Sequence, residues 1–231
     1  MNYPKHLAII PDGNRTRSRS QWLSVFDWYL KSVETTVHIA NYIFSQTNID
    51  VFTGWGMSTE NLKKRPDEET NYLFQLYKIC GEALDEILQT YQVNFKWIGN
   101  PAWISSDFLD YLESQQQKFH FPNSPKVMIF AINYGGKDEI IRGIQKLALS
   151  WQEISEESLS QHMDLACIPP VDLIIRTKWD ISRRLSGFMS WWMSYAELYF
   201  TPTLYPAFTI EELQQGLQRF DSITEHRNFG A

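Results

Sequence analysis

Short apolar runs alternate with longer amphipathic stretches along this chain, and that alternation constrains the fold more than any other feature. The runs are rich in β-branched and aromatic residues, and their nearly continuous hydrophobicity is typical of strands covered on both faces of a parallel sheet. They lie at residues 7–10, 50–55, 93–98, 127–132 and 171–175, with a weaker sixth at 198–200. The alternation predicts one α/β domain over residues 1–231, with a central, mostly parallel six-stranded sheet flanked by helices.

The amphipathic stretches predict helices between the strands. The clearest covers 66–91, where three acidic residues favour the positive end of a helix dipole and apolar residues then recur at helical spacing. Further helices are expected at 105–119, 137–151 and 209–220. Ligands of such folds bind beyond the carboxyl ends of the strands, so the residues that follow each apolar run are the candidates for function.

Composition excludes several classes of protein. With 43% hydrophobic and 21% charged residues the chain is typical of a soluble globular protein, and its net charge of −6 argues against a general nucleic-acid binder. Cys80 and Cys167 form neither a disulfide framework nor a zinc motif. There is no run of about 18 apolar residues, and the amino end lacks the apolar stretch of a signal peptide, so a cytoplasmic location is expected.

The first apolar run is followed by Pro11-Asp12-Gly13-Asn14-Arg15-Thr16-Arg17-Ser18-Arg19. A glycine allows close backbone approach, arginines supply forked donors, and a neighbouring carboxylate could hold Mg²⁺ against phosphate groups. The segment therefore indicates a phosphate-binding loop. An Asp-Gly-Asn turn followed by solvated arginines explains the same residues equally well.

Two later strand ends carry polar residues as well. Ser58-Thr59-Glu60-Asn61 follows the second run, and a simple helix cap is the favoured explanation of this pattern. Arg176-Thr177 and Arg183-Arg184-Leu185-Ser186 follow the fifth run and form a second basic cluster. Six of the ten arginines lie in the two basic loops, so positive charge is concentrated after two predicted strands although the net charge is negative. Glu197, inside an aromatic stretch, fits a structural carboxylate or a metal ligand.

Taken together, these segments resemble the cis-prenyltransferase family, that of undecaprenyl diphosphate synthase and its relatives. Residues 6–14 are similar to the family's HxAxIMDGN opening, and Ser58 to Asn61 with Arg65 and Pro66 is similar to FSxEN…RP. Three more blocks follow in order, with 133–139 resembling NYGGRxEI, 172–177 resembling DLxIRT and 195–200 resembling YxELYF. The resemblance covers nearly the whole chain.

This family couples isopentenyl diphosphate to an allylic prenyl diphosphate with a new cis double bond. The resemblance implies that Asp12 is the principal catalytic residue and anchors Mg²⁺ on a diphosphate, that Asn61 accepts or relays a proton, and that Glu197 completes the metal site, often toward a partner subunit. Arg176, Arg184 and Ser186 would hold the isopentenyl diphosphate. The substrate-binding residues it implies are Gly13, Asn14, Arg15, Thr16, Arg17, Ser58, Thr59, Glu60, Arg65, Arg176, Arg184, Leu185 and Ser186.

The resemblance also implies an assembly and a place for the prenyl chain. The helix at 66–91 would form part of the wall of a hydrophobic substrate tunnel. A homodimer is expected, with the apolar stretch 188–200 in its interface, together with peripheral membrane contact during release of a lipid product. No nucleic-acid partner is expected.

The chain departs from the family pattern mainly in the first loop. Pro11 stands where the family has Met, and Arg15-Thr16-Arg17 replaces its usual GRW or RRY/F, so the allylic-diphosphate loop is the most altered region. Two extra residues separate Arg176 from Arg184. Three activities remain open: regular cis condensation, irregular head-to-middle coupling of C5 diphosphates of the lavandulyl type, and a non-catalytic subunit of the same fold.

Overall fold

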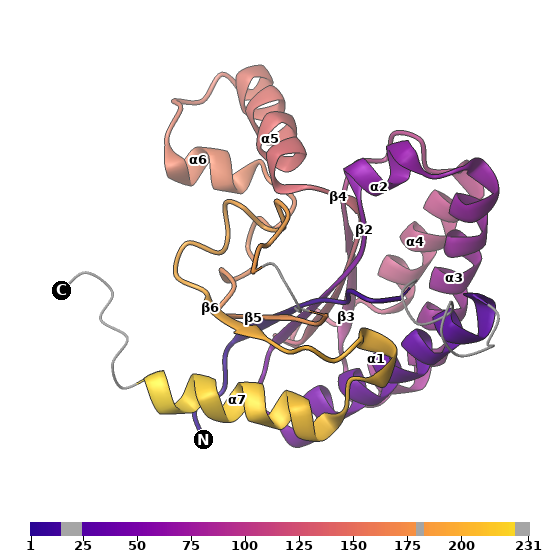
Figure 1. Ribbon diagram of the computed structural model, residues 1–231. Coiled ribbons are helices and arrows are strands. Elements are labelled where there is room, and N and C mark those ends of the chain that lie inside the picture. The colour runs from indigo at the N-terminus through magenta and orange to yellow at the C-terminus, as the bar shows by residue number, and fades with distance from the viewer. Residues whose placement is uncertain (15–24, 179–182, 225–231) are drawn as a thin grey trace.

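Six parallel strands form one sheet in the computed structural model, which describes residues 1–14, 25–178 and 183–224 (Figure 1). The spatial order is β3-β4-β2-β1-β5-β6, and every pairing of neighbours is parallel. Each predicted apolar run is a strand. No strand of the sheet is antiparallel to its neighbour, because long crossovers and not hairpins connect the described strands. The strands are β1 (His6–Ile10), β2 (Val51–Ser58), β3 (Asn94–Ile98), β4 (Val127–Tyr134), β5 (Leu173–Arg176) and β6 (Glu197–Phe200).

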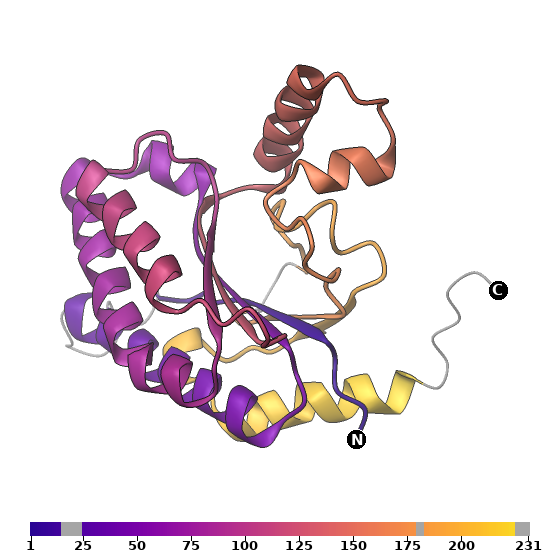
Figure 2. The ribbon, with the colours of Figure 1, turned by 180° about the vertical axis from the view of Figure 1, so that it is seen from behind.

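One face of the sheet is covered by α1 (Val25–Gln46), α3 (Asp67–Thr90), α4 (Ser106–Lys118) and α7 (Ile210–Thr224). Alternate residues of the strands, such as Leu7 and Ile9 of β1, pack against these helices in the larger apolar core. Figure 2, which views the molecule from behind, shows α3 and α4 side by side over this face. The intervening residues of β1 point the other way, into a second core.

The second core lies beneath α5 (Gly136–Ser150) and α6 (Glu156–Gln161). It contains Ala8 and Ile10 of β1 together with Phe188 and Trp192 from the turns that precede β6. Both views show α5 and α6 beyond the carboxyl end of β4 (Figures 1 and 2). The apolar stretch that was expected at a dimer interface therefore contributes much of its surface to the fold of its own chain.

The boundaries of the four predicted helices agree with the observed ones to within four residues. Helices α1 and α6 and the short 3₁₀ helix η1 (Tyr205–Ala207) were not predicted, and of α2 (Thr59–Lys64) only the N-cap was predicted. Helix α1 combines aromatic and β-branched residues, among them Trp28, Thr35 and Val37, which lower intrinsic helix propensity. It is stabilised by packing on the sheet, where Ile39 and Ile43 are almost fully buried. In the described part of the chain no helix is both long enough and apolar enough to cross a bilayer.

The buried His6 joins β1 to its neighbours. The Pro169 carbonyl lies 2.8 Å from Nδ1, which therefore carries the proton and donates, while Nε2 accepts from the Thr53 hydroxyl at 2.8 Å. Burial lowers the pKa of this imidazole from 6.5 to about 4, against smaller raising effects of Pro169 and Asp172. The folded state therefore requires a neutral His6.

We expect acid to destabilise the protein through His6. Because its folded-state pKa lies below the unfolded value, the unfolded chain binds the extra proton, and stability is full above about pH 6.5 and falls as pH drops toward 4. The free energy of unfolding should decrease by about 2 kcal/mol between pH 7 and pH 5 through this group. Urea titrations should show a smaller decrease in His6→Asn, whereas His120→Asn, at an exposed histidine, should behave as wild type. An unchanged pH dependence in His6→Asn would contradict this assignment.

Candidate active site

Asp12 directly follows Pro11, just beyond the carboxyl end of β1. Hydrogen bonds to residues that follow β5 and β6 hold its backbone in place. Its N–H donates to the Thr177 hydroxyl at 2.8 Å, and that hydroxyl donates to the Asp12 carbonyl at 2.9 Å. The same carbonyl accepts from the Tyr205 N–H at 3.0 Å. The carboxylate is 38% exposed. A rigid backbone thus presents a solvent-accessible carboxylate.

Gly13 and Asn14 complete the described part of this loop. Gly13 has a φ of +102°, and a Cβ there would lie 2.6 Å from a methyl of Leu204, so the chain passes too close for any side chain. Its N–H donates to Asp12 Oδ1 at 2.7 Å. Asn14 Oδ1 accepts from the Ser32 hydroxyl of α1 at 3.0 Å. The loop is therefore held between β5, Leu204 and α1.

Arg176, the last residue of β5, connects Asp12 to the second basic segment. Its Nη2 donates to Asp12 Oδ2 at 2.9 Å, and its Nη1 donates to the Arg184 carbonyl and, at 3.2 Å, to the Ser186 hydroxyl. The Arg176 side chain is only 9% exposed, so this pairing is better shielded from solvent than a surface ion pair. Asp12 after β1, Arg176 at the end of β5 and the turn after β5 thus meet at one place, as expected for residues at the carboxyl ends of parallel strands.

The segment after β2 contributes the opposite side of the site. Ser58 is the N-cap of α2, and its hydroxyl accepts from the Asn61 N–H at 3.1 Å. The helix-cap prediction is therefore confirmed. The cap also places Ser58, Glu60 and Asn61 on the rim of the same cavity as Asp12.

A cavity of about 990 Å³ connects these polar groups to the apolar space between the sheet and helices α1 and α3. At its polar end lie Asp12, Asn61, Arg65, Arg176, Lys178, Arg184 and Ser186. Its apolar lining comes from the sheet and both helices, including Ile9, Met128, Phe130, Val33, Leu73, Leu76, Tyr77 and Cys80. The helix over 67–90 thus lines the cavity, as was expected of the helix at 66–91.

Two glycines of β2 border this cavity in different ways. A Cβ at Gly54 would meet nothing within 4 Å, so that position opens directly onto empty space. A Cβ at Gly56 would lie 3.0 Å from the Tyr77 ring, whose hydroxyl donates to the Gly56 carbonyl at 2.7 Å. Gly56 permits this close contact between β2 and α3, whereas the missing side chain of Gly54 leaves space for a ligand.

The ionisable groups in the apolar part of the cavity remain neutral. Burial raises the pKa of the Cys80 thiol to about 12, and it raises the pKa values of Tyr77 and Tyr205 well above the usual phenol value. None of these groups ionises near neutral pH. The interior therefore carries no charge from them and suits a hydrocarbon chain better than a polar substrate.

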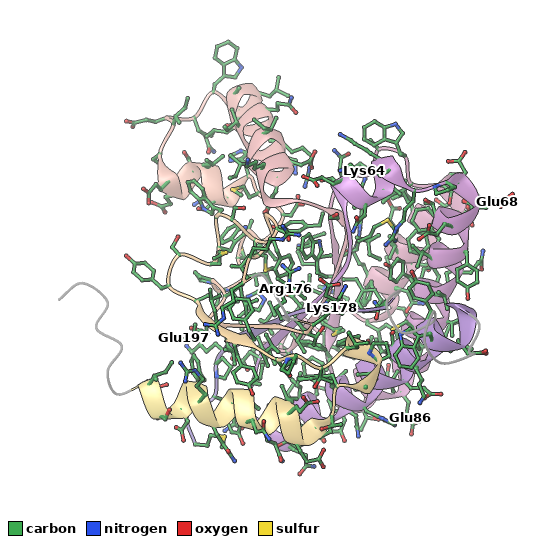
Figure 3. All side chains as sticks on the ribbon, in the orientation of Figure 1. Lys64, Glu68, Glu86, Arg176, Lys178 and Glu197 are labelled. Carbon is green, nitrogen blue, oxygen red and sulfur yellow. The ribbon has the colours of Figure 1, made fainter. Side chains whose placement is uncertain are left out.

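Three predicted site residues do not line the cavity. Thr59 packs its hydroxyl against Gly135, Leu185 belongs to the second core, and Glu197 lies at the opposite end of the strands. The register pairs Leu173 with Glu197 and Arg176 with Phe200, so Glu197 is about 10 Å along the sheet from the level of Arg176. Figure 3 shows Glu197 beside β6, toward the edge of the molecule. Arg15, Thr16 and Arg17 lie outside the described residues.

Other residues that line the cavity were not predicted from the sequence. From α1 come Tyr29, Ser32 and Thr36, and the Thr36 hydroxyl lies 2.9 Å from that of Tyr205. Lys178 lies at the polar end, two residues after Arg176. Its position directly beyond the fifth apolar run was the available signal.

A buried carboxylate supports the segment that carries Ser186. Glu139 is fully buried and accepts from the Tyr134 hydroxyl at 2.5 Å, the Trp192 indole N–H at 3.0 Å and the Asp164 N–H at 3.0 Å. Burial raises its pKa, although these donors oppose the shift. The Gly136 N–H donates to the Gly187 carbonyl at 2.9 Å, so the start of α5 directly contacts this turn.

We expect Glu139→Ala to lower the free energy of unfolding by about 3 kcal/mol, since it leaves several buried donors without an acceptor. Glu139→Gln keeps one carbonyl acceptor and should cost about half as much. Urea denaturation measures both, with Glu113→Ala on the exposed face of α4 as the control. Equal losses in the Ala and Gln variants would show that the hydrogen bonds do not carry the effect.

Comparison with known proteins agrees with this geometry. The family model of the prenyltransferases, described as undecaprenyl diphosphate synthase, matches residues 10–230. The chain belongs to this family. An isoprenyl transferase of Wolinella succinogenes is 39% identical over 230 residues, which cover 100% of this chain and 98% of that protein. The protein is therefore a prenyltransferase of the undecaprenyl diphosphate synthase family.

Two solved structures share the whole fold. Lavandulyl diphosphate synthase from Lavandula x intermedia, crystallised with dimethylallyl diphosphate, superposes with a TM-score of 0.88 at 27% identity and 99% coverage of both chains. A probable undecaprenyl diphosphate synthase from Campylobacter jejuni superposes with a TM-score of 0.78 at 30% identity and full coverage of both chains. The prenyltransferase thus shares its fold with a lavandulyl diphosphate synthase and with a probable undecaprenyl diphosphate synthase.

Proposed function

We propose that this prenyltransferase condenses isopentenyl diphosphate with an allylic prenyl diphosphate and forms a cis prenyl diphosphate. The observation that carries the proposal is the single cavity that joins a polar end at the carboxyl ends of β1, β2 and β5 to an uncharged apolar interior. Each substrate has a diphosphate head and a hydrocarbon tail. The cavity offers a matching environment for both, and its volume of about 990 Å³ leaves room for an elongated chain.

Asp12 would act at the departing diphosphate. The described residues contain no cluster of three or more His, Cys, Asp or Glu side chains that could hold a metal by themselves. A single accessible carboxylate beside a diphosphate nevertheless fits Mg²⁺, which is commonly held by one or two carboxylates plus substrate phosphates. When bound, Mg²⁺ supplies stabilisation of the negative charge that develops on the leaving diphosphate. Asp12 would orient the diphosphate through that contact.

Three residues would orient the isopentenyl diphosphate. Arg176 is already fixed by Asp12, the Arg184 carbonyl and Ser186, so a donor of defined direction is in place before substrate binds. The Arg184 side chain and the Ser186 hydroxyl would complete the contacts. Asn61, on the opposite rim, would accept or relay the proton that is lost when the new double bond forms.

Labelled isopentenyl diphosphate with C5, C10 and C15 allylic primers tests the proposal, in the presence of Mg²⁺ and of excess EDTA. We expect incorporation with at least one primer, a cis double bond by NMR of the product, and loss of incorporation in EDTA. Failure with every primer would overturn the condensation. That result would favour the alternative of a non-catalytic subunit. For such a subunit, Asp12→Ala should leave the role of the protein in the cell unchanged.

Irregular coupling is the second candidate, and the superposition on lavandulyl diphosphate synthase at a TM-score of 0.88 favours it. In this reaction two C5 diphosphates join head to middle. Incubation of the protein with dimethylallyl diphosphate alone and Mg²⁺ should then produce a branched C10 diphosphate. If only unreacted substrate is recovered, while C10 or C15 primers are extended, the regular condensation stands.

The assembly is part of the proposal. Glu197 lies far from Asp12 in its own chain, so a role at the metal would require a partner subunit in a homodimer. Light scattering should then give twice the chain mass of 27.2 kDa. A membrane-associated release of product would appear as faster turnover with phospholipid vesicles or detergent.

A further inference from the structure

Lys178 is a cation of the cavity that none of the family motifs includes. It follows Arg176-Thr177 at the end of β5, and its N–H donates to the Thr203 carbonyl at 2.8 Å. Both Arg176 and Lys178 line the polar end of the cavity, and Figure 3 labels them near the centre of the molecule. The hydrogen bond to Thr203 fixes the backbone from which the Lys178 side chain extends.

The backbone at Lys178 is in a conformation that lysine rarely adopts. Its φ is +56°, in the left-handed region that favours glycine. A glycine would meet this backbone requirement without the conformational cost of a side chain. A lysine at such a position, extending into a ligand cavity, is a candidate for function.

Among the described residues, no acidic side chain forms an ion pair with Lys178. The carboxylate of Asp12 pairs with Arg176 at 2.9 Å, and that of Glu69 pairs with Arg65 at 3.3 Å. In the described ranges, the Lys178 side chain has no hydrogen bond, ion pair or ring contact. A cation without an acidic partner at the polar end of a cavity attracts an anion.

We propose that Lys178 binds a phosphate group of a substrate diphosphate in this cavity, a proposal that rests on the proposed function. Arg176 is directed by Asp12 and the turn at 184–186, whereas Lys178 has a flexible stem and a compact charge that can follow the diphosphate. The two cations have different tasks. Arg176 sets the direction of the diphosphate, and Lys178 adds affinity for it.

Inorganic pyrophosphate tests the contact without any prenyl tail. Calorimetric titration should show about tenfold weaker binding to Lys178→Gly than to wild type, the loss expected for a charge-assisted contact. Lys178→Arg should bind within about threefold of wild type, since it restores the charge. Lys5→Met, at the opposite end of β1, loses one lysine charge as well and should bind as wild type.

The glycine variant separates binding from folding. Because glycine suits the positive φ, the melting temperature of Lys178→Gly should equal or exceed that of wild type while its affinity falls. In turnover assays this variant should show a KM about tenfold higher for one of the two diphosphates, with a nearly unchanged kcat. The substrate whose KM rises is the one that Lys178 contacts.

The outcomes distinguish this proposal from the condensation itself. Wild-type pyrophosphate binding that Lys178→Gly weakens, without turnover of any prenyl substrate, supports the Lys178 contact and refutes the proposed reaction. Unchanged pyrophosphate affinity in Lys178→Gly overturns the Lys178 contact, even if wild type is an active transferase. Wild type that binds no pyrophosphate overturns it too.

Discussion

Replacement of Asp12 by Asn should lower prenyl-transfer turnover by about 10²–10³-fold, the loss typical of removing one preorganised electrostatic contact to a transition state. Asn has nearly the same size as Asp and keeps one carbonyl oxygen, which can accept a hydrogen bond from the Gly13 N–H or from Arg176. It removes the negative charge that would hold the cation against the leaving diphosphate. The effect should therefore fall on kcat, with little change in the fold.

Turnover with the best primer and thermal denaturation together measure this effect. Asp110→Asn, at an exposed carboxylate on α4, is the matched control and should keep full activity. If Asp12→Asn retains most of the wild-type kcat at an unchanged melting temperature, the carboxylate is not the group that acts on the diphosphate. A lower melting temperature without loss of kcat would assign Asp12 to the fold instead.

Gly54→Leu should shorten the product. A side chain at this position enters empty cavity space, because a Cβ there would have no neighbour within 4 Å. A leucine side chain approaches the size of an isoprene unit, so we expect products shorter by about one five-carbon unit or more. Since glycine is unfavourable inside a strand, the melting temperature should not fall.

Gly56, two residues further along β2, is the control position for product length. Gly56→Ala places its Cβ 3.0 Å from the Tyr77 ring, so it should lower stability through the contact between β2 and α3. It should leave the product length nearly unchanged. Chromatography of dephosphorylated products measures the chain length of both variants. Wild-type products from Gly54→Leu would show that the growing chain does not pass this position.

Most of the sheet could be predicted because buried parallel strands have a signature that depends only on local sequence. The weakest run, at 198–200, is indeed a strand, and its neighbours complete β6. Helix α1 could not be predicted in this way. Its aromatic and β-branched residues give a weak helical signal, and α3, against which it packs, is separated from it in the chain by β2 and α2.

The site was predicted where residues directly follow a strand. Asp12, Arg176 and Asn61 border one cavity because the carboxyl ends of parallel strands meet at one edge of the sheet. Thr59 was predicted with its neighbours but turns toward Gly135, since adjacent residues in the first turn of a helix face different directions. Lys178 closely follows the fifth apolar run but was not predicted, because no sequence pattern indicates its positive φ or its place in the cavity.

Sequence by itself determined the α/β class, the parallel sheet and the concentration of six of ten arginines in two segments that follow predicted strands, since these depend on local hydrophobicity and chain order. Only the tertiary structure shows how the charged groups at the cavity are paired. Asp12 pairs with Arg176 and Glu69 pairs with Arg65, whereas Lys178 has no ion pair within the described residues. The ion pair of Asp12 and Arg176 joins residues that lie 164 positions apart in the chain, so folding, and not net charge, determines where an anion can bind.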